Sequence, residues 1–346
     1  MHISRPFTSD DTRRLDEALH ELVDSGGSPG GVIVCGTTGG DRHILTAGIV
    51  APECGDAPPG ENTLYDIASL TKVVATWPLV GRAVTDGRMD LDAPIHAYLP
   101  RIDGDAPSGA VTIRQLLAHT SGLRAETRLD HYRNTATGLA ELMCREALEQ
   151  PPGSHRYINR GYILLGLALA HIYARPLYEL ADRLWAEAGM THTTYGPVSR
   201  ARHVAPTEQR LNGAPRIWGA PHDDNAALLG GVAGHAGVFS TPADLAVYAD
   251  HLLVQHAATT AIGAWLDASL APQADIEPGL HRGLSWILAD GHQTAYHHGF
   301  TGTSLYLAPY AGRYVVICTN AVYHGPARER IAPLRALARK TISTTF

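Results

Sequence analysis

Strand-like segments lie near both ends of this 346-residue chain, and mostly helical patterns fill the length between them. Residues 31–38 and 43–50 are short runs rich in valine, isoleucine and threonine, and the glycine-containing loop between them predicts a β-hairpin. Further runs of this kind predict an antiparallel meander: GLSWILAD, QTAYHHGF, TSLYLAP and RYVVICTN. The simplest assembly is one antiparallel sheet, built from both ends of the chain and flanked by helices, so the predicted fold class is α/β (α+β).

The first and last helices have recognisable sequence signals. Apolar residues recur at helical spacing over residues 15–23, and Thr8 with Asp11 matches a capping box at the start of this helix. A final helix is expected over about residues 326–341, and Pro333 is expected to kink it.

The helical patterns between the two strand regions indicate an inserted lobe. Residues 83–274 read as helices separated by proline-marked joints. We therefore expect an α/β sheet lobe made from residues 1–82 and 275–346, and a helical lobe made from residues 83–274. The active-site cleft is expected where the two lobes meet.

Composition narrows the classes of partner. The net charge is −6 and the chain has no basic block, so we expect no nucleic-acid partner. No run of about 18 apolar residues predicts a membrane span. The charged N-terminal segment has no apolar core typical of a signal peptide, and the cysteines show no CxxC pair. These features favour a cytoplasmic location, and the oligomeric state stays open.

The segment SLTK places Ser69 three residues before Lys72, in a chain with only two lysines. If a helix begins near Ser69, both side chains lie on one face, and free backbone N–H groups surround the serine. A serine hydroxyl needs a base to take its proton, and lysine can serve only in its neutral form, which arginine does not adopt. Pro78 is expected to kink or end the first part of this helix. The pair alone is a weak signal, because a serine can precede a lysine by chance.

Two further segments carry candidate side chains. In PPGSHRYINRGYILLG, Tyr157 and Asn159 precede an apolar helix, where a tyrosine can relay a proton and an asparagine can hold an amide. A tyrosine packed on the core beside an asparagine turn explains this segment equally well.

The other segment is YHHGFTG, in which His297 and His298 precede Gly299 at the end of a predicted strand. Glycine there lets a substrate approach the strand closely, and the backbone N–H of Phe300 could act with that of Ser69 as an oxyanion donor. We therefore expect this segment, His297 to Phe300, to bind substrate, with both histidines among the binding residues. The alternative is a pair of strand histidines, one facing inwards and one outwards.

Taken together, SLTK, YIN and HHG resemble the serine β-lactamase and penicillin-binding-protein superfamily, and most of all its class C β-lactamase-related branch. This branch also holds esterases, D-amino-acid-specific peptidases and acyltransferases. The phrases LLAHTSGL and GVFSTPADLAVYA agree with it, so the resemblance covers about residues 30–320. It implies a β-lactamase/transpeptidase-like fold.

The resemblance also implies the roles of the candidate residues. Ser69 forms the acyl-enzyme, Lys72 activates it, Tyr157 shuttles protons and Asn159 holds the substrate amide. His297 stands where many relatives have a lysine that binds the substrate carboxylate. A histidine is only partly charged near neutral pH, so this departure puts β-lactamase activity in doubt.

A second resemblance concerns the glycine-rich stretch 216–241. Its His222, Asp223, Asn225 and His235 are similar to a signature of a subgroup that includes a muramyl-L-alanine amidase and a D-alanyl-D-alanine carboxypeptidase. We expect this loop to form a wall of the cleft and these four residues to take part in substrate binding. Side chains of these types can bind a metal, but serine chemistry needs none, so we expect hydrogen bonds that fix the loop, and neither metal nor cofactor.

Three functions follow as hypotheses. The first is a serine acyl-enzyme hydrolase of an amide or ester in a small molecule or peptide, with a muropeptide as one option. The second is a transacylase that passes the acyl group to an amine or alcohol in a biosynthetic pathway. The third is a catalytically silent ligand-binding protein on the same fold.

Overall fold

The computed structural model describes residues 6–132 and 137–343. Helix α1 (Ser9–Asp24) comes first, and Thr8 and Asp11 form the predicted capping box at its start. The hairpin of β1 (Gly30–Thr37) and β2 (Arg42–Gly48) follows, as the sequence predicted.

The main sheet has eight antiparallel strands in the order β2-β1-β11-β10-β9-β8-β7-β6. The N-terminal hairpin joins the C-terminal strands through β1 and β11, with Val32 opposite Cys318. The single antiparallel sheet made from both ends of the chain is therefore confirmed. Its C-terminal strands are β6 (Ala274–Glu277), β7 (Leu280–Arg282), β8 (Ile287–Ala289), β9 (Thr294–His298), β10 (Ser304–Ala308) and β11 (Arg313–Thr319).

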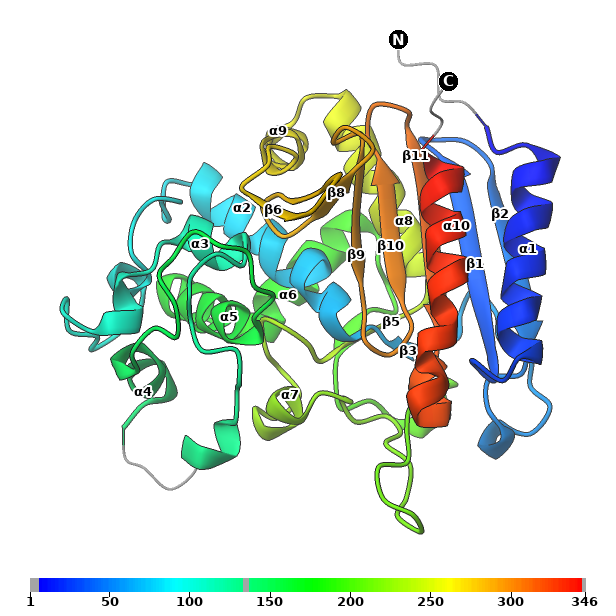
Figure 1. Ribbon diagram of the computed structural model, residues 1–346, viewed down its shortest axis with the longest axis horizontal. Coiled ribbons are helices and arrows are strands. Elements are labelled where there is room, and N and C mark those ends of the chain that lie inside the picture. Colours follow the sequence, from blue (N-terminus) through cyan, green and yellow to red (C-terminus); the bar gives the residue numbers. More distant parts are fainter. Residues whose placement is uncertain (1–5, 133–136, 344–346) are drawn as a thin grey trace.

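Helices cover both faces of this sheet (Figure 1). In β1, Ile33 and Cys35 face a core shared with α1 and with α10 (Ala332–Ile342), whereas Val32 and Val34 face the larger core on the other side. This alternation is the period of two expected of a strand that is buried on both faces. The larger core includes helix α8 (Pro242–Ala257), which packs against β1 and β11.

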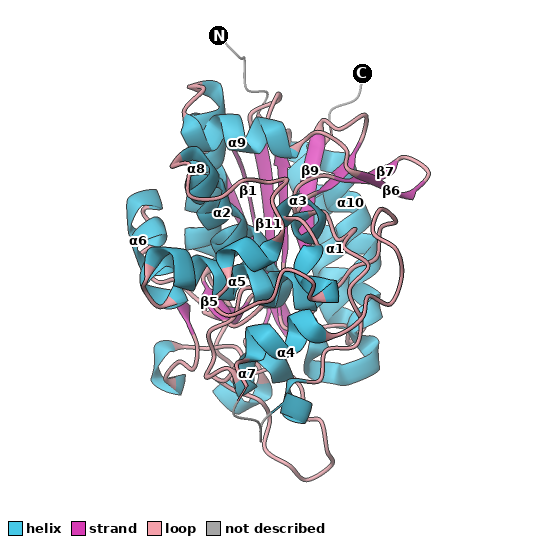
Figure 2. Cartoon of the chain, turned by 90° about the vertical axis from the view of Figure 1, so that its left-hand side faces the viewer, coloured by secondary structure: helices cyan, strands magenta, loops and turns pink. Residues whose placement is uncertain are grey.

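Most of the remaining helices lie beyond α8, on the side away from α1 (Figures 1 and 2). The remaining helices are α2 (Trp77–Thr85), α3 (Ile113–Leu117), α4 (Leu139–Arg145), α5 (Asn159–Tyr173), α6 (Leu177–Ala188), α7 (Asp224–Leu228) and α9 (Ala261–Ser269). A small second sheet joins β3 (Tyr65–Asp66), β5 (Val238–Ser240) and β4 (Thr194–Tyr195). Within the described residues, no helix is both long enough and apolar enough to cross a membrane.

Several predicted boundaries differ from the structure. The last helical stretch begins near residue 326 as predicted, but it is a 3₁₀ helix up to Ile331 and becomes α10 at Ala332. The non-helical dihedrals lie at His324 and Gly325 rather than at Pro333, which falls in the first turn of α10, where a missing N–H costs nothing. Helix α8 belongs to the stretch 83–274 in sequence, yet it packs on the sheet. The division into two lobes with the boundaries given above stays a prediction.

The helix that follows Ser69 is irregular. A 3₁₀ turn over Ala68–Leu70 leads into a π-helical segment, Lys72–Thr76, before α2 begins. Pro78 has no N–H, so the carbonyl of Val74 loses its usual donor. The amide of Trp77 donates to the carbonyl of Lys72, which leaves the carbonyl of Val73 without its usual donor as well. Tyr248 donates its hydroxyl proton to the carbonyl of Val73 at 2.7 Å, and Trp185 donates its indole N–H to the carbonyl of Val74 at 3.0 Å. The interruption expected at Pro78 therefore takes the form of a π segment with replaced hydrogen bonds.

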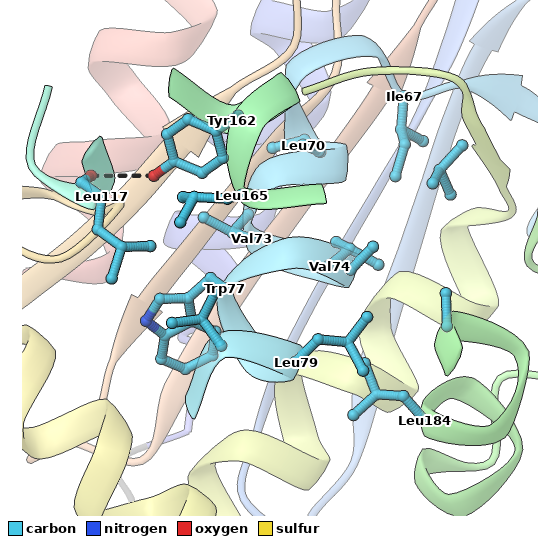
Figure 3. Close-up of a cluster of buried hydrophobic side chains, with 14 of the residues drawn as sticks. Ile67, Leu70, Val73, Val74, Trp77, Leu79, Leu117, Tyr162, Leu165 and Leu184 are labelled. Carbon is cyan, nitrogen blue, oxygen red and sulfur yellow. Dashed lines mark hydrogen bonds between the residues drawn. The ribbon is translucent and has the colours of Figure 1, made fainter. Parts of the chain in front are cut away.

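This helix is enclosed by other helices (Figure 3). Leu70, Val73 and Trp77 are fully buried, and Tyr162 of α5 and Leu117 of α3 belong to the same core. The Tyr162 hydroxyl donates to the carbonyl of Leu117 at 2.9 Å. Dense packing of this kind leaves little freedom for the segment that presents Ser69.

Candidate active site

Ser69 and Lys72 form the contact predicted from their spacing. Lys72 is fully buried, and its Nζ lies 2.9 Å from Ser69 Oγ. The same nitrogen lies 2.9 Å from Oδ1 of Asn159, the first residue of α5, and 3.2 Å from the carbonyl oxygen of His235. All of these partners are neutral oxygens. The lysine is thus held beneath the serine by hydrogen bonds, and it has no ion pair within residues 6–132 and 137–343.

The backbone before Ser69 is strained and clamped. Ala68 has a φ of +46°, a left-handed conformation that alanine rarely adopts. The buried carboxyl of Asp66 accepts hydrogen bonds from the amides of Ala68 at 2.8 Å and His222 at 2.6 Å. Burial raises the pKa of Asp66, and these amides oppose the rise. Sequence analysis missed Asp66, whose role depends on a residue far along the chain.

The turn after β9 packs against the turn that carries Ser69. The amide of Gly299 donates to the carbonyl of Thr303 at 2.8 Å. A Cβ atom on Gly299 would lie 2.1 Å from Thr303 Oγ1 and 2.4 Å from the carbonyl oxygen of Ile67. The glycine therefore permits this close approach of the two turns. Phe300 follows with its ring stacked on His222, at 5.3 Å between ring centres.

Tyr157 stands over the lysine at the edge of the cleft. The Nζ atom of Lys72 lies 4.9 Å from the centre of its ring, and the residue is 41% exposed. On the other side its ring contacts His119, with 4.5 Å between centres. A tyrosine in this position can exchange protons with groups near the lysine.

The loop before β5 supports the lysine from below. His235 is fully buried, and its Nε2 lies 2.7 Å from Oδ1 of Asp223. Burial opposes ionisation of Asp223, but hydrogen bonds from His235 and the Ala226 amide outweigh it and hold the pKa of this carboxyl below its ordinary value. Burial also lowers the pKa of His235. A neutral His235 and an ionised Asp223 thus fix the carbonyl that faces Lys72.

The remaining polar residues of this loop have partners of their own. Asn225 accepts a hydrogen bond from the amide of Leu129 at 3.1 Å and donates to the carbonyl of Thr127 at 2.8 Å. His222 Nε2 lies 3.0 Å from Oε1 of Glu208. In the part of the chain that the structure describes, no group of His, Cys, Asp or Glu side chains is arranged to hold a metal ion. The hydrogen bonds of Asn225 tie this loop to the segment around residues 127–129.

These elements enclose a cleft of about 930 Å³. Its walls include both polar and charged side chains, and Arg210 pairs with Asp224 while Arg128 pairs with Asp130. Some of the predicted site residues do not line this cleft: Lys72, His235, His297, His298 and Gly299. The predicted residues that do are Ser69, Tyr157, Asn159, His222, Asp223, Asn225 and Phe300.

Comparison with known proteins now places the chain. Residues 15–340 match the family model described as Beta-lactamase. The chain belongs to the β-lactamase family. It is thus an enzyme of that family, as the sequence predicted.

Individual proteins agree with this assignment. The chain is 32% identical, over 226 residues, to an Escherichia coli (strain K12) protein provisionally named a D-alanyl-D-alanine carboxypeptidase. The alignment covers 55% of this chain and 51% of that relative, so the chain spans about half of its length. A class C beta-lactamase from Rhodobacter sphaeroides has a TM-score of 0.74 at 18% identity, covering 95% of this chain and 99% of that one.

A second solved structure, EstCE1, is described as a hydrolase with promiscuous acyltransferase activity. Its TM-score is 0.74 at 18% identity, and the match covers 96% of this chain and 98% of that one. These structures establish the fold, and the expected β-lactamase/transpeptidase-like architecture is confirmed.

In this β-lactamase-family protein, His297 is neutral and lies behind Tyr157. The residue is 2% exposed, and its ring centre lies 6.1 Å from that of Tyr157. Its Nδ1 lies 3.0 Å from the carbonyl oxygen of His298, so this nitrogen carries the proton, and the buried Nε2 has no hydrogen-bond partner among the residues that the structure describes. Burial, followed by the charges of Arg282 and Lys72, holds the pKa of His297 well below its ordinary value. No cation therefore stands at this position.

The neighbouring His298 points to the other face of the sheet. Its Nε2 lies 3.0 Å from the hydroxyl of Tyr306, and its ring contacts Tyr296. Successive residues of a strand face opposite sides, so one histidine of the pair must leave the site. The structure thus separates His298 from Ser69, contrary to its assignment as a substrate-binding residue.

Two residues near Tyr157 were missed by sequence analysis. Arg282 is 2% exposed, and its guanidinium carbon lies 5.9 Å from the centre of the tyrosine ring. It donates to the carbonyl of Ser285 at 3.0 Å and to Nε2 of His155 at 3.2 Å, and it has no carboxylate partner among the described residues. His119 lies within the phrase LLAHTSGL, which was a usable signal, whereas Arg282 has no distinguishing sequence context.

Proposed function

We propose that this β-lactamase-family protein is a serine acyl-enzyme hydrolase that cleaves an amide or ester in a small molecule or peptide. The observation that carries the proposal is the 2.9 Å contact between Ser69 Oγ, on the cleft wall, and Lys72 Nζ beneath it. A serine nucleophile needs an adjacent general base, and a buried lysine in contact with the hydroxyl can supply it.

Acylation begins when Ser69 Oγ attacks the substrate carbonyl. Lys72 in its neutral form takes the hydroxyl proton, the carbon–oxygen bond to the serine forms, and negative charge develops on the carbonyl oxygen. The amides of Ser69 and Phe300 stand as the donors to this oxygen. When the bond to the leaving group breaks, the leaving group takes a proton through Tyr157, at the mouth of the cleft.

Deacylation repeats these steps with water. A water molecule gives a proton to the base, attacks the ester carbonyl and releases the acid, and Ser69 recovers its proton. Asn159 hydrogen-bonds Lys72 through Oδ1 at 2.9 Å, which leaves its side-chain amide N–H groups for a substrate carbonyl.

The substrate class that we favour is a peptide or muropeptide fragment. The carboxypeptidase name of the E. coli relative supports a peptide bond as the target. The cleft is roomy and lined by charged and amide side chains, which suits a polar ligand. The absence of a cation at His297 argues against a β-lactam whose carboxylate needs one. The cytoplasmic location stays a prediction.

Transfer of the acyl group to an amine or alcohol is the second candidate. It draws support from the open position of Tyr157, where an acceptor larger than water has room to approach, and from the acyltransferase activity in the description of EstCE1. Product analysis with and without added amines separates the two functions, because a hydrolase yields only the free acid.

The deciding experiment is intact-mass spectrometry after exposure to a fluorophosphonate probe, with wild type and Ser69→Ala treated in parallel. A single adduct in the wild type that is absent from Ser69→Ala is the expected result. Short acyl esters then report the lifetime of the acyl-enzyme: fast loss in water supports the hydrolase, and discharge only by amines supports the transacylase. No adduct with any probe would instead favour the silent binding protein.

A further inference from the structure

A second cavity, of about 290 Å³, lies on the face of the sheet that α10 covers. Strand residues Tyr296, His298 and Tyr306 line one side of it. Arg328, Arg335 and Arg339, from α10 and the segment before it, line the other side.

The positive charge in this cavity is not balanced. Arg328 pairs with Glu329 at 2.9 Å, and this is the only acidic residue in the wall. Arg335 donates to neutral oxygens, those of Ser304 at 3.1 Å and Gly299 at 2.8 Å. Across residues 6–132 and 137–343, neither Arg335 nor Arg339 has an ion pair with a carboxylate.

These positive charges also affect the pKa of His298, which lies in the wall of the cavity. Burial, and then the charges of Arg335, Arg282 and Arg339, hold the pKa of His298 well below its ordinary value. Burial and the charge of Arg328 lower the pKa of Arg335 as well. A local excess of cations is costly unless an anion offsets it, and the whole chain carries a net charge of −6.

We propose that this cavity, hereafter the α10 cavity, binds an oxyanion group, a carboxylate or a phosphate, of a small ligand. Guanidinium groups present paired N–H donors whose geometry matches both anions. The half-buried position of Arg335 and Arg339 reduces competition from water, and the tyrosine rings give the ligand an apolar wall.

The α10 cavity touches the turn that completes the active site. Phe300 lines both this cavity and the cleft that contains Ser69. Arg335 donates to the carbonyl of Gly299, and the guanidinium carbon of Arg328 lies 4.2 Å from the centre of the Phe300 ring. An anion bound to these arginines therefore alters the position of the Phe300 amide and the rate of reaction at Ser69. This coupling rests on the proposed function, whereas the binding site does not.

The test is isothermal titration calorimetry at constant ionic strength, with inorganic phosphate and, separately, with N-acetyl-D-alanine. The proteins are wild type, Arg339→Gln and, as a matched control, Lys340→Gln, which removes one charge from an exposed residue of the same helix outside the cavity. We expect saturable binding to wild type, affinity reduced about ten-fold in Arg339→Gln, and unchanged affinity in Lys340→Gln. Whichever anion binds more tightly identifies the source of the oxyanion.

The proposal is wrong if folded wild type binds neither anion saturably, or if both variants lose affinity equally, since that would be a general charge effect. Thermal melts confirm that the variants are folded, and Arg328→Gln replaces Arg339→Gln if the latter is not. The titration is repeated with Ser69→Ala, which lacks the proposed nucleophile but keeps the α10 cavity. Anion binding is therefore measured independently of whether the proposed hydrolase is correct.

Discussion

The guanidinium of Arg282 lies 5.9 Å from the centre of the Tyr157 ring, on a buried side chain without a carboxylate partner among the described residues. His297, at the position where a lysine is common in the resemblance described above, is held neutral. The fixed positive charge near Tyr157 therefore comes from Arg282. A nearby cation favours the deprotonated form of an acid or base.

The first prediction concerns Arg282→Gln. Loss of the cation makes the base that starts the reaction harder to deprotonate, so the acidic limb of the kcat/KM profile moves to higher pH. We expect a shift of about half to one pH unit and a fall of about three- to ten-fold in kcat/KM on the acidic limb. The pH profile of wild type against the variant measures both.

Arg282→Lys is the matched control for this prediction, because it keeps the charge and loses the guanidinium geometry. It is expected to restore most of the acidic limb. If the pH profiles of kcat/KM are the same for wild type and Arg282→Gln, Arg282 has no electrostatic role in the reaction. Its function would then be limited to the hydrogen bonds with Ser285 and His155.

The second prediction concerns Lys72→Arg. Arginine keeps the charge but cannot be a neutral base, so acylation of Ser69 is expected to slow by about a hundred- to ten-thousand-fold. Single-turnover mass spectrometry of the acyl adduct measures this rate directly. Lys72→Ala tests the alternative of steric damage: if Lys72→Ala acylates at the wild-type rate, the lysine is not the base.

The site was predictable from sequence where its contacts are local. Ser69 and Lys72 are three residues apart, so one helical turn brings them together whatever the rest of the chain does. The two histidines were treated as one group, and the alternation of the strand separates His298 from His297. That alternation was visible in the sequence, where one inward and one outward histidine was the alternative to a shared role in binding substrate.

Contacts between distant segments were not predictable in this way. The clamp between Asp66 and the amide of His222 joins residues 156 apart, and nothing near Asp66 in the sequence indicates it. The contact of Arg282 with Tyr157 was equally unpredictable, because only the packing of β7 against the loop before α5 brings the two residues together. The strands at both chain ends were found because their periodicity is local, whereas the π segment depends on Tyr248 and Trp185 from other helices.

The third prediction is a loss of stability on mild acidification. Burial is the main reason that the pKa values of His119 and His297 lie well below 6.5 in the folded protein. In the unfolded chain these groups bind protons near pH 6.5, so the unfolded state gains protons first and is favoured as pH falls below that value. Each group is expected to remove about 1.4 kcal/mol of unfolding free energy per pH unit, until its folded pKa is reached.

Urea unfolding at pH 7, 6 and 5 measures how the unfolding free energy changes with pH. His297→Gln is expected to reduce this pH dependence by the contribution of one histidine. Asp66 acts with the opposite sign, because its pKa is raised, and the folded state gains stability as this carboxyl takes up a proton. A stability that is constant between pH 7 and 5 in both wild type and His297→Gln would contradict the assignment of neutral, buried histidines.

The fourth prediction concerns Gly299→Ala. The added Cβ would lie 2.1 Å from Thr303 Oγ1 and 2.4 Å from the carbonyl oxygen of Ile67, so the two turns must separate. Separation moves the amide of Phe300 away from Ser69 and weakens the oxyanion donors. We expect kcat to fall by about a hundred-fold or more, with a loss of about 1–3 kcal/mol in unfolding free energy.

Gly60→Ala is the matched control, because a Cβ there meets nothing within 4 Å. It is expected to leave both activity and urea midpoint close to wild type. The comparison of kcat with KM separates the two roles of Gly299: a lower kcat at constant KM points to the oxyanion turn, whereas a higher KM at constant kcat would mean that the turn only binds substrate. Full activity in Gly299→Ala would show that the Phe300 amide takes no part in stabilising the oxyanion.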